Sequence, residues 1–232
     1  MNIVAIYGTE HKGSTYNIVQ LFLGKLLGEQ DELTEFYLPK DMPHFCQGCA
    51  LCFGKGESFC PHRDKITPIQ IAMGKANLII LASPVYVLHV SGQMKAFLDH
   101  FGFQFMIHRP DKTMFSKTAI VVTTAAGGGM KSTIKDMTMS LTHWGVGKIF
   151  TYGKAVAASD WKGVSDDKKK QIEKEVNKLS VKIANKSKSS IPGFKVKSLF
   201  YIMRFIQKKF AFNPIDKDYW EEQGWLKKKR PW

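Results

Sequence analysis

Two stretches decide the fold: MNIVAIYGTEHKGSTYN at residues 1–17 and LIILASPVYVLHVSGQMKAFLD at residues 78–99. Each stretch runs from an apolar strand into a turn of small and polar residues and then into a helix. In a parallel α/β sheet such turns lie together at the carboxyl ends of the strands, where backbone N–H groups face outward. The pattern therefore predicts a site for a nucleotide-like ligand that carries a phosphate.

Apolar runs alternate with amphipathic segments along residues 1–186, which indicates βαβ units and a parallel sheet. We expect strands at Ile3–Tyr7, Leu33–Leu38, Asn77–Ala82, Thr118–Thr124 and Ile149–Val156. We expect helices at Thr15–Leu27, Val90–Phe103, Met130–Trp144 and from Ser165 to about Ala184. Five strands separated by helices predict an α/β fold of the flavodoxin-like type, in which a doubly wound five-stranded parallel sheet forms the middle of three α/β/α layers.

The remaining residues, 187–232, are expected to form a basic, helical C-terminal extension after a Lys/Ser linker that ends at Pro192-Gly193. One helical face of it carries Leu199, Ile202, Met203, Ile206 and Phe210. We favour packing of this face against the domain or a second subunit, because Trp220 and Trp225 need burial. The alternative is a basic amphipathic helix that lies on an anionic membrane surface.

The net charge of +14 is concentrated near the end of the chain, where residues 162–232 hold 19 Lys and Arg against 8 Asp and Glu. It therefore says little about the ligand site. Asn2 is followed at once by an expected strand with no basic region before it, so we expect no signal peptide. We also expect no membrane-spanning helix, because no apolar run approaches the roughly 20 residues that such a helix needs. The four cysteines all lie within residues 46–60 and do not form the framework of a secreted protein. We expect a cytoplasmic protein.

The first turn, Gly8–Thr15, offers hydroxyl groups and a flexible backbone at the start of a helix. A dinucleotide-binding G-x-G-x-x-G motif is absent from it. A P-loop would need Lys after the second glycine, but Gly13 is followed by Ser14 and Thr15. A nucleotide with one phosphate, such as FMN, fits this turn better.

The chain resembles the flavodoxin-like NAD(P)H-dependent FMN reductases, including the iron–sulfur flavoproteins, over residues 1–160. Three segments carry the resemblance: Gly8–Asn17, Ser83–Asp99 and Thr123–Gly128. The resemblance implies that FMN is bound by residues of all three segments, namely Thr9, Ser14, Thr15, Tyr16, Pro84, Val85, Tyr86, Val87, Thr124, Ala125, Ala126, Gly127 and Gly128. His11 and Lys12 join these candidates as groups that can balance the charge of the phosphate.

The first segment departs from the family pattern, which usually has Pro and Arg where this chain has Glu10 and His11. A carboxylate close to a phosphate would be repelled, so we expect Glu10 to face outward. The phosphate charge would then be balanced by Lys12, His11 or backbone amides.

Four cysteines, Cys46, Cys49, Cys52 and Cys60, lie within fifteen residues. Their compact spacing suits one [4Fe–4S] cluster, and it also resembles the cysteine motif of the iron–sulfur flavoproteins. An equally weighted alternative is a set of packed or free thiols without a cluster. Zinc fits the spacing less well, and a redox-active Cys49–Cys52 disulfide is a third alternative.

The resemblance implies an FMN-dependent oxidoreductase that passes hydride and electrons from NAD(P)H through FMN to an acceptor. No side chain is then required as acid, base or nucleophile, because the flavin carries the chemistry. The alternative is an iron–sulfur flavoprotein that acts as an electron carrier with a ferredoxin-like partner. A third hypothesis is a membrane- or nucleic-acid-associated binding protein that uses the fold as a scaffold. We expect a homo-oligomer, as a dimer, and no nucleic-acid partner.

Overall fold

The computed structural model describes residues 1–187 and 191–232, and the expected Lys/Ser linker lies partly outside the described residues. A five-stranded sheet consists of β1 (Asn2–Tyr7), β2 (Glu32–Tyr37), β3 (Leu78–Ala82), β4 (Thr118–Ala125) and β5 (Lys148–Ala155). All strand pairs are parallel, in the order β2-β1-β3-β4-β5. The predicted flavodoxin-like fold is confirmed, and the strand order reverses between β1 and β3.

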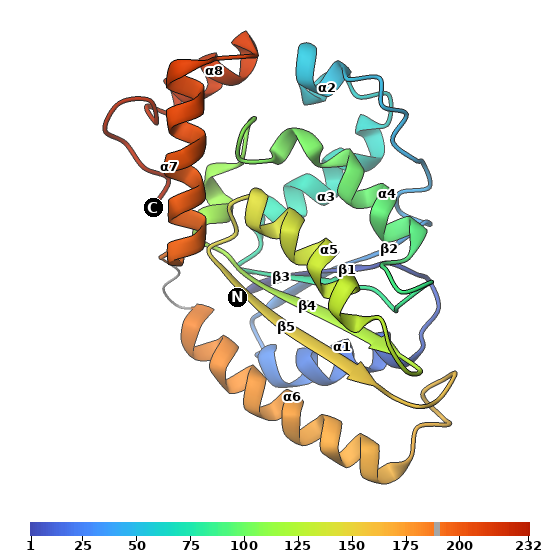
Figure 1. Ribbon diagram of the computed structural model, residues 1–232. Helices are drawn as coiled ribbons and strands as arrows, with labels where there is room; N and C mark the ends of the chain where they lie inside the picture. Colours follow the sequence, from blue (N-terminus) through green and yellow to red (C-terminus); the bar gives the residue numbers. More distant parts are fainter. Residues whose placement is uncertain (188–190) are drawn as a thin grey trace.

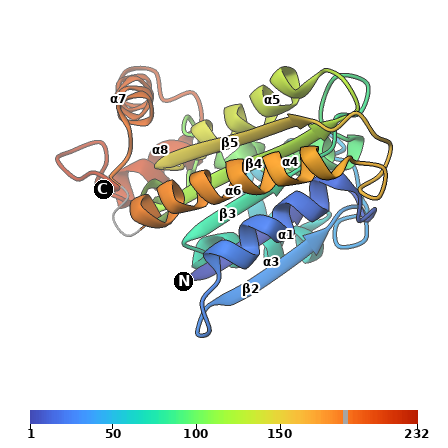
Figure 2. The same ribbon diagram turned by 90° about the horizontal axis from the view of Figure 1, so that it is seen from below.

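Helices cover both faces of the sheet (Figures 1 and 2). The helices α1 (Ser14–Leu26) and α6 (Asp166–Ser187) lie on one face. The helices α3 (Arg63–Lys75), α4 (Gly92–His100) and α5 (Met130–His143) lie on the other. Each face has its own apolar core, because alternate residues of a strand point to opposite sides: Val4 and Ile6 pack in one core and Ile3 and Ala5 in the other.

Two expected elements have different bounds in the structure. The helix predicted at Val90–Phe103 is shorter because Ser91 Oγ accepts a hydrogen bond from Met94 N as its N-cap and a 3₁₀ turn, η2 (Gly102–Gln104), follows its end. The loop predicted over residues 39–67 contains α2 (Leu51–Gly54) and η1 (Glu57–Phe59), and α3 already begins at Arg63. Another 3₁₀ turn, η3 (Lys112–Ser116), precedes β4.

The C-terminal extension forms α7 (Phe194–Lys209) and α8 (Pro214–Glu222). It begins where Gly193 N donates to Gly147 O, directly before β5 and therefore at the end of the sheet opposite to the carboxyl-end turns. Trp220 and Trp225 are buried in a third apolar cluster together with Met106, Phe115, Val196 and Phe200. Within the described residues, no helix combines the length and the apolar character that a membrane span requires.

The face of α7 that packs inward overlaps the predicted one only in part, since Leu199 and Met203 pack against the third apolar cluster. Val196 and Phe200 are buried, whereas Ile202 and Phe210 are 54% and 51% exposed. The helix has apolar residues on more than one side, so periodicity alone does not identify the buried side. The rings of Trp220 and Trp225, which lie next to Phe200, decide it.

Candidate functional site

Three loops converge at the carboxyl ends of β1, β3 and β4. The first loop comprises residues 8–13, the second residues 83–91 and the third residues 126–129. Gly8 N donates to Ala82 O over 2.7 Å, and Val85 N donates to Thr124 O over 2.9 Å. The cavity between the loops also receives residues that follow β5. It is lined by Thr9, His11, Gly13, Ser14, Thr15, Pro84, Val85, Tyr86, Thr124, Ala125, Ala126, Val156, Ala158 and Ser159.

Two buried serines hold the first and second loops together. Ser91 Oγ donates to Gly8 O over 2.6 Å, and Ser91 N donates to Ser83 Oγ over 3.0 Å. A Cβ atom at Gly8 would lie 2.6 Å from Ser91 Oγ and 3.0 Å from Met94 Cβ. Glycine is therefore required at this position by the close approach of the two loops.

The start of α1 faces the cavity without a protein partner for its positive end. Its N-cap residue, Gly13, supplies no side-chain hydrogen bond, and the first turn has no acidic residue. Ser14 is 8% exposed and its Oγ has no hydrogen-bond partner in the structure. Free N–H groups, the helix dipole and an unpartnered buried hydroxyl together fit the terminal phosphate of FMN.

Replacing this hydroxyl tests the phosphate site. We expect Ser14→Ala to weaken FMN binding by roughly 1.5–3 kcal/mol, the value of a hydrogen bond to a charged group. Titration of the apoprotein with FMN measures the loss. Ser165→Ala is the control, because Ser165 also begins a helix but does not line the cavity. Equal FMN affinity in wild type and both variants would show that Ser14 does not contact the phosphate.

The cavity contains most of the residues predicted to bind FMN, but Lys12, Tyr16, Val87, Gly127 and Gly128 do not line it. The Lys12 ammonium lies 5.2 Å from the centre of the Tyr16 ring and 5.7 Å from that of Tyr37, and all three residues therefore gather beside β2. The side chain of Glu10 is exposed. Among the residues proposed to balance the phosphate, His11 and the backbone amides are at the cavity.

Sequence reasoning missed Val156, Ala158 and Ser159, which follow β5 and line the same cavity. They carry no glycine-rich or hydroxyl-rich pattern that would mark them. The predicted parallel sheet could have indicated these residues, because the carboxyl end of its fifth strand must lie at the same edge of the sheet as the other loops.

The second loop ends in a tight turn at the mouth of the cavity. Tyr86 and His89 exchange two backbone hydrogen bonds of 2.9 and 3.1 Å. Between them, Val87 and Leu88 have positive φ angles of 48° and 67°. This is costly for a β-branched residue and resembles the strain found at functional sites. Val87 is 96% exposed, so burial does not compensate for the strain.

Replacing Val87 with glycine tests whether the backbone of this turn is strained. We expect Val87→Gly to raise the stability by about 1 kcal/mol, since only glycine adopts positive φ without a steric cost. Val87→Ala is the matched control, because it removes the same methyl groups but keeps the Cβ atom that causes the strain. Thermal melting of both variants measures the effect. If Val87→Gly melts at or below the temperature of Val87→Ala, the turn is not strained.

All four cysteines surround a second cavity. It is lined by Cys46, Gln47, Gly48, Cys49, Ala50, Cys52, Phe53, Cys60, Pro61, His62, Asp99 and His100. All four thiols are free, with Cys46 and Cys49 exposed and Cys52 and Cys60 partly buried. The predicted cysteine cluster is therefore gathered in space as well as in sequence.

Two of the four thiols in this cavity resist ionisation. Burial raises the pKa of the Cys52 thiol, and the neighbouring thiolates of Cys60, Cys46 and Cys49 raise it further. Burial also raises the pKa of Cys60, with Cys49 and Cys46 adding to the rise. Thiolates that oppose one another's ionisation are stabilised by a positively charged metal centre, which fits an iron–sulfur cluster.

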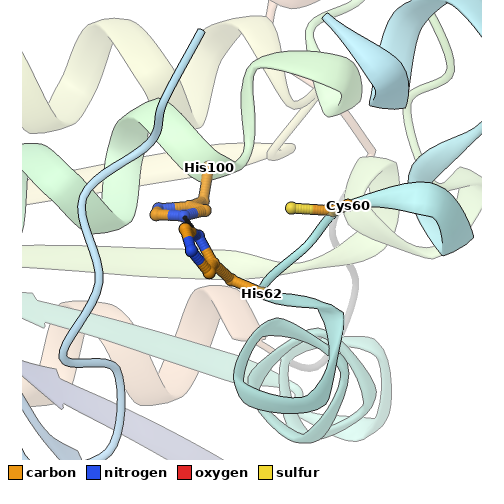
Figure 3. A group of neighbouring side chains, drawn as sticks. All are labelled: Cys60, His62 and His100. Carbon is orange, nitrogen blue, oxygen red and sulfur yellow. Dashed lines mark hydrogen bonds between the residues drawn. The ribbon is translucent and has the colours of Figure 1, made fainter. Parts of the chain in front are cut away.

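A pair of histidines adjoins Cys60, as Figure 3 shows. His100 Nδ1 lies 2.8 Å from Ala96 O and donates to it, so His100 Nε2 accepts from His62 Nδ1 over 3.0 Å. The ligand atoms of Cys60, His62 and His100 all lie within 4.8 Å of one another, a spacing that would also suit a single metal ion. Sequence reasoning missed both histidines, although His62 follows Cys60 by two residues.

Helix α4 connects the two cavities. Its N-cap, Ser91, contacts Gly8 beside the first cavity, and its last residue, His100, lines the second. A rise of 1.5 Å per residue makes this span roughly 14 Å. A rigid helix therefore fixes the separation between the two candidate sites.

A family model described as NADPH-dependent FMN reductase matches residues 1–162. An iron–sulfur flavoprotein of Archaeoglobus fulgidus is 25% identical and covers 97% of this chain and 100% of its own length. An iron–sulfur flavoprotein of Methanocaldococcus jannaschii is 32% identical over 59% of this chain and 69% of its own length. The structure of an FMN-dependent NADH-azoreductase of Bacillus anthracis str. Ames Ancestor in complex with FMN shares the fold, with a TM-score of 0.57, 11% identity, and coverage of 80% of this chain and 100% of that chain.

Proposed function

We propose a binding site for FMN in this chain, which belongs to the family of NADPH-dependent FMN reductases. The protein is an FMN-dependent oxidoreductase. FMN binds in the cavity at the ends of β1, β3 and β4, with its phosphate at the start of α1. The observation that carries this placement is the buried, unpartnered Ser14 Oγ at an uncapped helix start.

Bound FMN supplies the acceptor for hydride from NAD(P)H and can release electrons to a further acceptor. The residues of the chain bind and orient the flavin. Ser14 and the first amides of α1 hold the phosphate, while Pro84, Val85 and Tyr86 contact the ring system and the ribityl chain. Thr15 Oγ1 and Thr124 Oγ1, 2.6 Å apart, fix the start of α1 to the end of β4. Ala125 and Ala126 leave room for the other edge of the ring.

A [4Fe–4S] cluster, held by Cys46, Cys49, Cys52 and Cys60, is the second part of the proposal. The gathering of four free thiols around one cavity supports it. The names of two relatives, both iron–sulfur flavoproteins, support it as well. Iron and acid-labile sulfide in protein purified without oxygen measure the cluster. Zinc in place of iron and sulfide would favour a single ion at Cys60, His62 and His100.

The reductase hypothesis and the electron-carrier hypothesis differ in the source of electrons. A reductase oxidises NAD(P)H directly, and the open mouth of the first cavity beside Tyr86, which is 45% exposed, supports access by a nicotinamide. Anaerobic mixing of the FMN-loaded protein with NADPH or NADH tests this. Rapid loss of oxidised flavin absorbance is expected. Flavin that is reduced only by a reduced ferredoxin-like protein would favour the carrier.

A homodimer is the assembly we propose, and the exposed side of α7 supports it. Phe194 and Ile202 of α7 and Met139 of α5 form an apolar surface between these two helices. Light scattering on the full-length protein tests the assembly. A monomer that sediments with anionic vesicles in a salt-sensitive way would instead support contact with a membrane surface. The cytoplasmic location stays a prediction.

A further inference from the structure

One buried arginine joins the cysteine segment, residues 46–60, to the C-terminal extension, two parts of the chain that are far apart in sequence. The Arg109 guanidinium donates to Asp216 on α8, to the carbonyl of Cys52 on α2 and, over 3.3 Å, to Glu57 on η1. The side chains of Arg109 and Asp216 are 6% and 2% exposed. Asp216 also accepts a hydrogen bond of 2.7 Å from His108 Nδ1. The planar fork of an arginine suits such a junction of three acceptors.

A second contact reaches the same short helix from the extension. Asn213 Nδ2 donates to the carbonyl of Phe53 over 2.8 Å. Two successive carbonyl groups, those of Cys52 and Phe53, are therefore held by groups that belong to or depend on the C-terminal extension. The ring of Phe53 also packs 4.6 Å from the ring of His108.

The cysteine segment needs such support, because it has little structure of its own. The helix α2 comprises four residues and buries none of them. The preceding residue, Ala50, has a positive φ of 57°. One helical turn is not stable in isolation. Arg109 contacts both Cys52 and Glu57, so it spans the stretch that separates the third cysteine from the fourth.

We propose that the C-terminal extension, through Arg109, Asp216 and Asn213, holds the four-cysteine segment in the conformation that binds a cluster. These three are positioning residues, since none of them lines the cavity of the cysteines. Asp216 and Glu57 pair with the charge of Arg109. Arg109 therefore acts on the thiols by fixing the backbone of the cysteine segment and not by its charge. The proposal rests on the proposed cluster for its biological purpose, but its structural content concerns the thiols alone.

Asn213→Asp is the most selective test. The variant keeps the Oδ1 atom that accepts from Ile215 N and begins α8, but it loses the donor to Phe53 O. In the cluster-free protein we expect the rate of alkylation of Cys52 and Cys60, measured by mass spectrometry, to rise roughly tenfold, as expected for loss of one hydrogen bond. Cys46 and Cys49 are already exposed and serve as internal controls whose rates stay unchanged.

Two further variants complete the experiment. Arg109→Lys keeps the charge but loses the fork, and we expect the same rise in Cys52 and Cys60 reactivity. Tyr219→Phe removes the hydrogen bond of 2.7 Å from α8 to Pro110 O without touching the cysteine segment, and we expect wild-type rates. If Asn213→Asp and Arg109→Lys react at wild-type rates, or if Tyr219→Phe reacts as fast as they do, the proposal is wrong.

Iron uptake separates this proposal from the proposed cluster. During anaerobic reconstitution with ferrous iron and sulfide, we expect Asn213→Asp to incorporate several-fold less iron than wild type at equal FMN content. If the wild type itself takes up no iron, the cluster hypothesis fails. The alkylation rates then still decide whether the extension positions the thiols.

Discussion

Deleting residues 194–232 is expected to unfold or aggregate most of the protein at ambient temperature. The deletion removes the partners of Phe115 and Met106 and takes away Phe200, Trp220 and Trp225, which are all buried. Burial of three such aromatic side chains contributes on the order of 10 kcal/mol as an upper bound. That is comparable with the whole stability of a domain, which is about 5–15 kcal/mol.

The fraction of the truncated protein that folds should still bind FMN, because none of the deleted residues, which are all described in the structure, lines the first cavity. Circular dichroism, light scattering and FMN titration on the soluble fraction measure these effects. A truncated protein that melts like the full-length protein and keeps its assembly state, but no longer sediments with anionic vesicles, would show that the extension is a membrane anchor. The burial of both tryptophans argues for packing.

The second large effect is expected at Gly8, where alanine should destabilise the protein and weaken FMN binding together. The added Cβ would lie 2.6 Å from Ser91 Oγ, so the serine must move and release Gly8 O and Ser83. Overpacking costs about 1–3 kcal/mol, and the loss of a buried hydrogen bond adds roughly 1–3 kcal/mol.

Gly24→Ala is the matched control for Gly8→Ala. Gly24 lies within α1 and has no atom near the position of an added Cβ. Alanine there should stabilise the protein by about 1 kcal/mol, because it is the better helix former. The same substitution thus has opposite signs at the two positions. Thermal melting and FMN titration check both, and a stabilised Gly8→Ala would refute the close packing of the two loops.

The regular part of the fold could be predicted from the sequence because strand and helix patterns are local. The expected strand at Leu33–Leu38, for example, differs from the observed Glu32–Tyr37 by one residue. The first and second loops could be predicted for the same reason, since each follows its strand directly. Tyr16 was placed at the ligand by resemblance and Lys12 by its charge, and the cation–π contacts of Lys12 place both beside β2.

The surroundings of the cysteines could not be predicted, because they depend on contacts between distant residues. Arg109 and Asp216 are separated by 107 residues, and His62 and His100 by 38. No periodicity relates such pairs. The inward side of α7 was predicted only in part for a related reason, since its partners Trp220 and Trp225 come from a later segment whose position only the folded chain shows.

Full-length protein purified without oxygen gives the most direct test of the central claim, that this chain binds FMN between the loops after β1, β3 and β4 and reduces it with NAD(P)H. Its absorption spectrum is recorded before and after the addition of NADPH, for wild type and for Ser14→Ala. We predict an oxidised flavin spectrum in the wild type that NADPH bleaches, and a smaller flavin content in Ser14→Ala. Wild-type protein that neither retains nor rebinds FMN, or flavin that stays oxidised with both NADPH and NADH, would contradict the account.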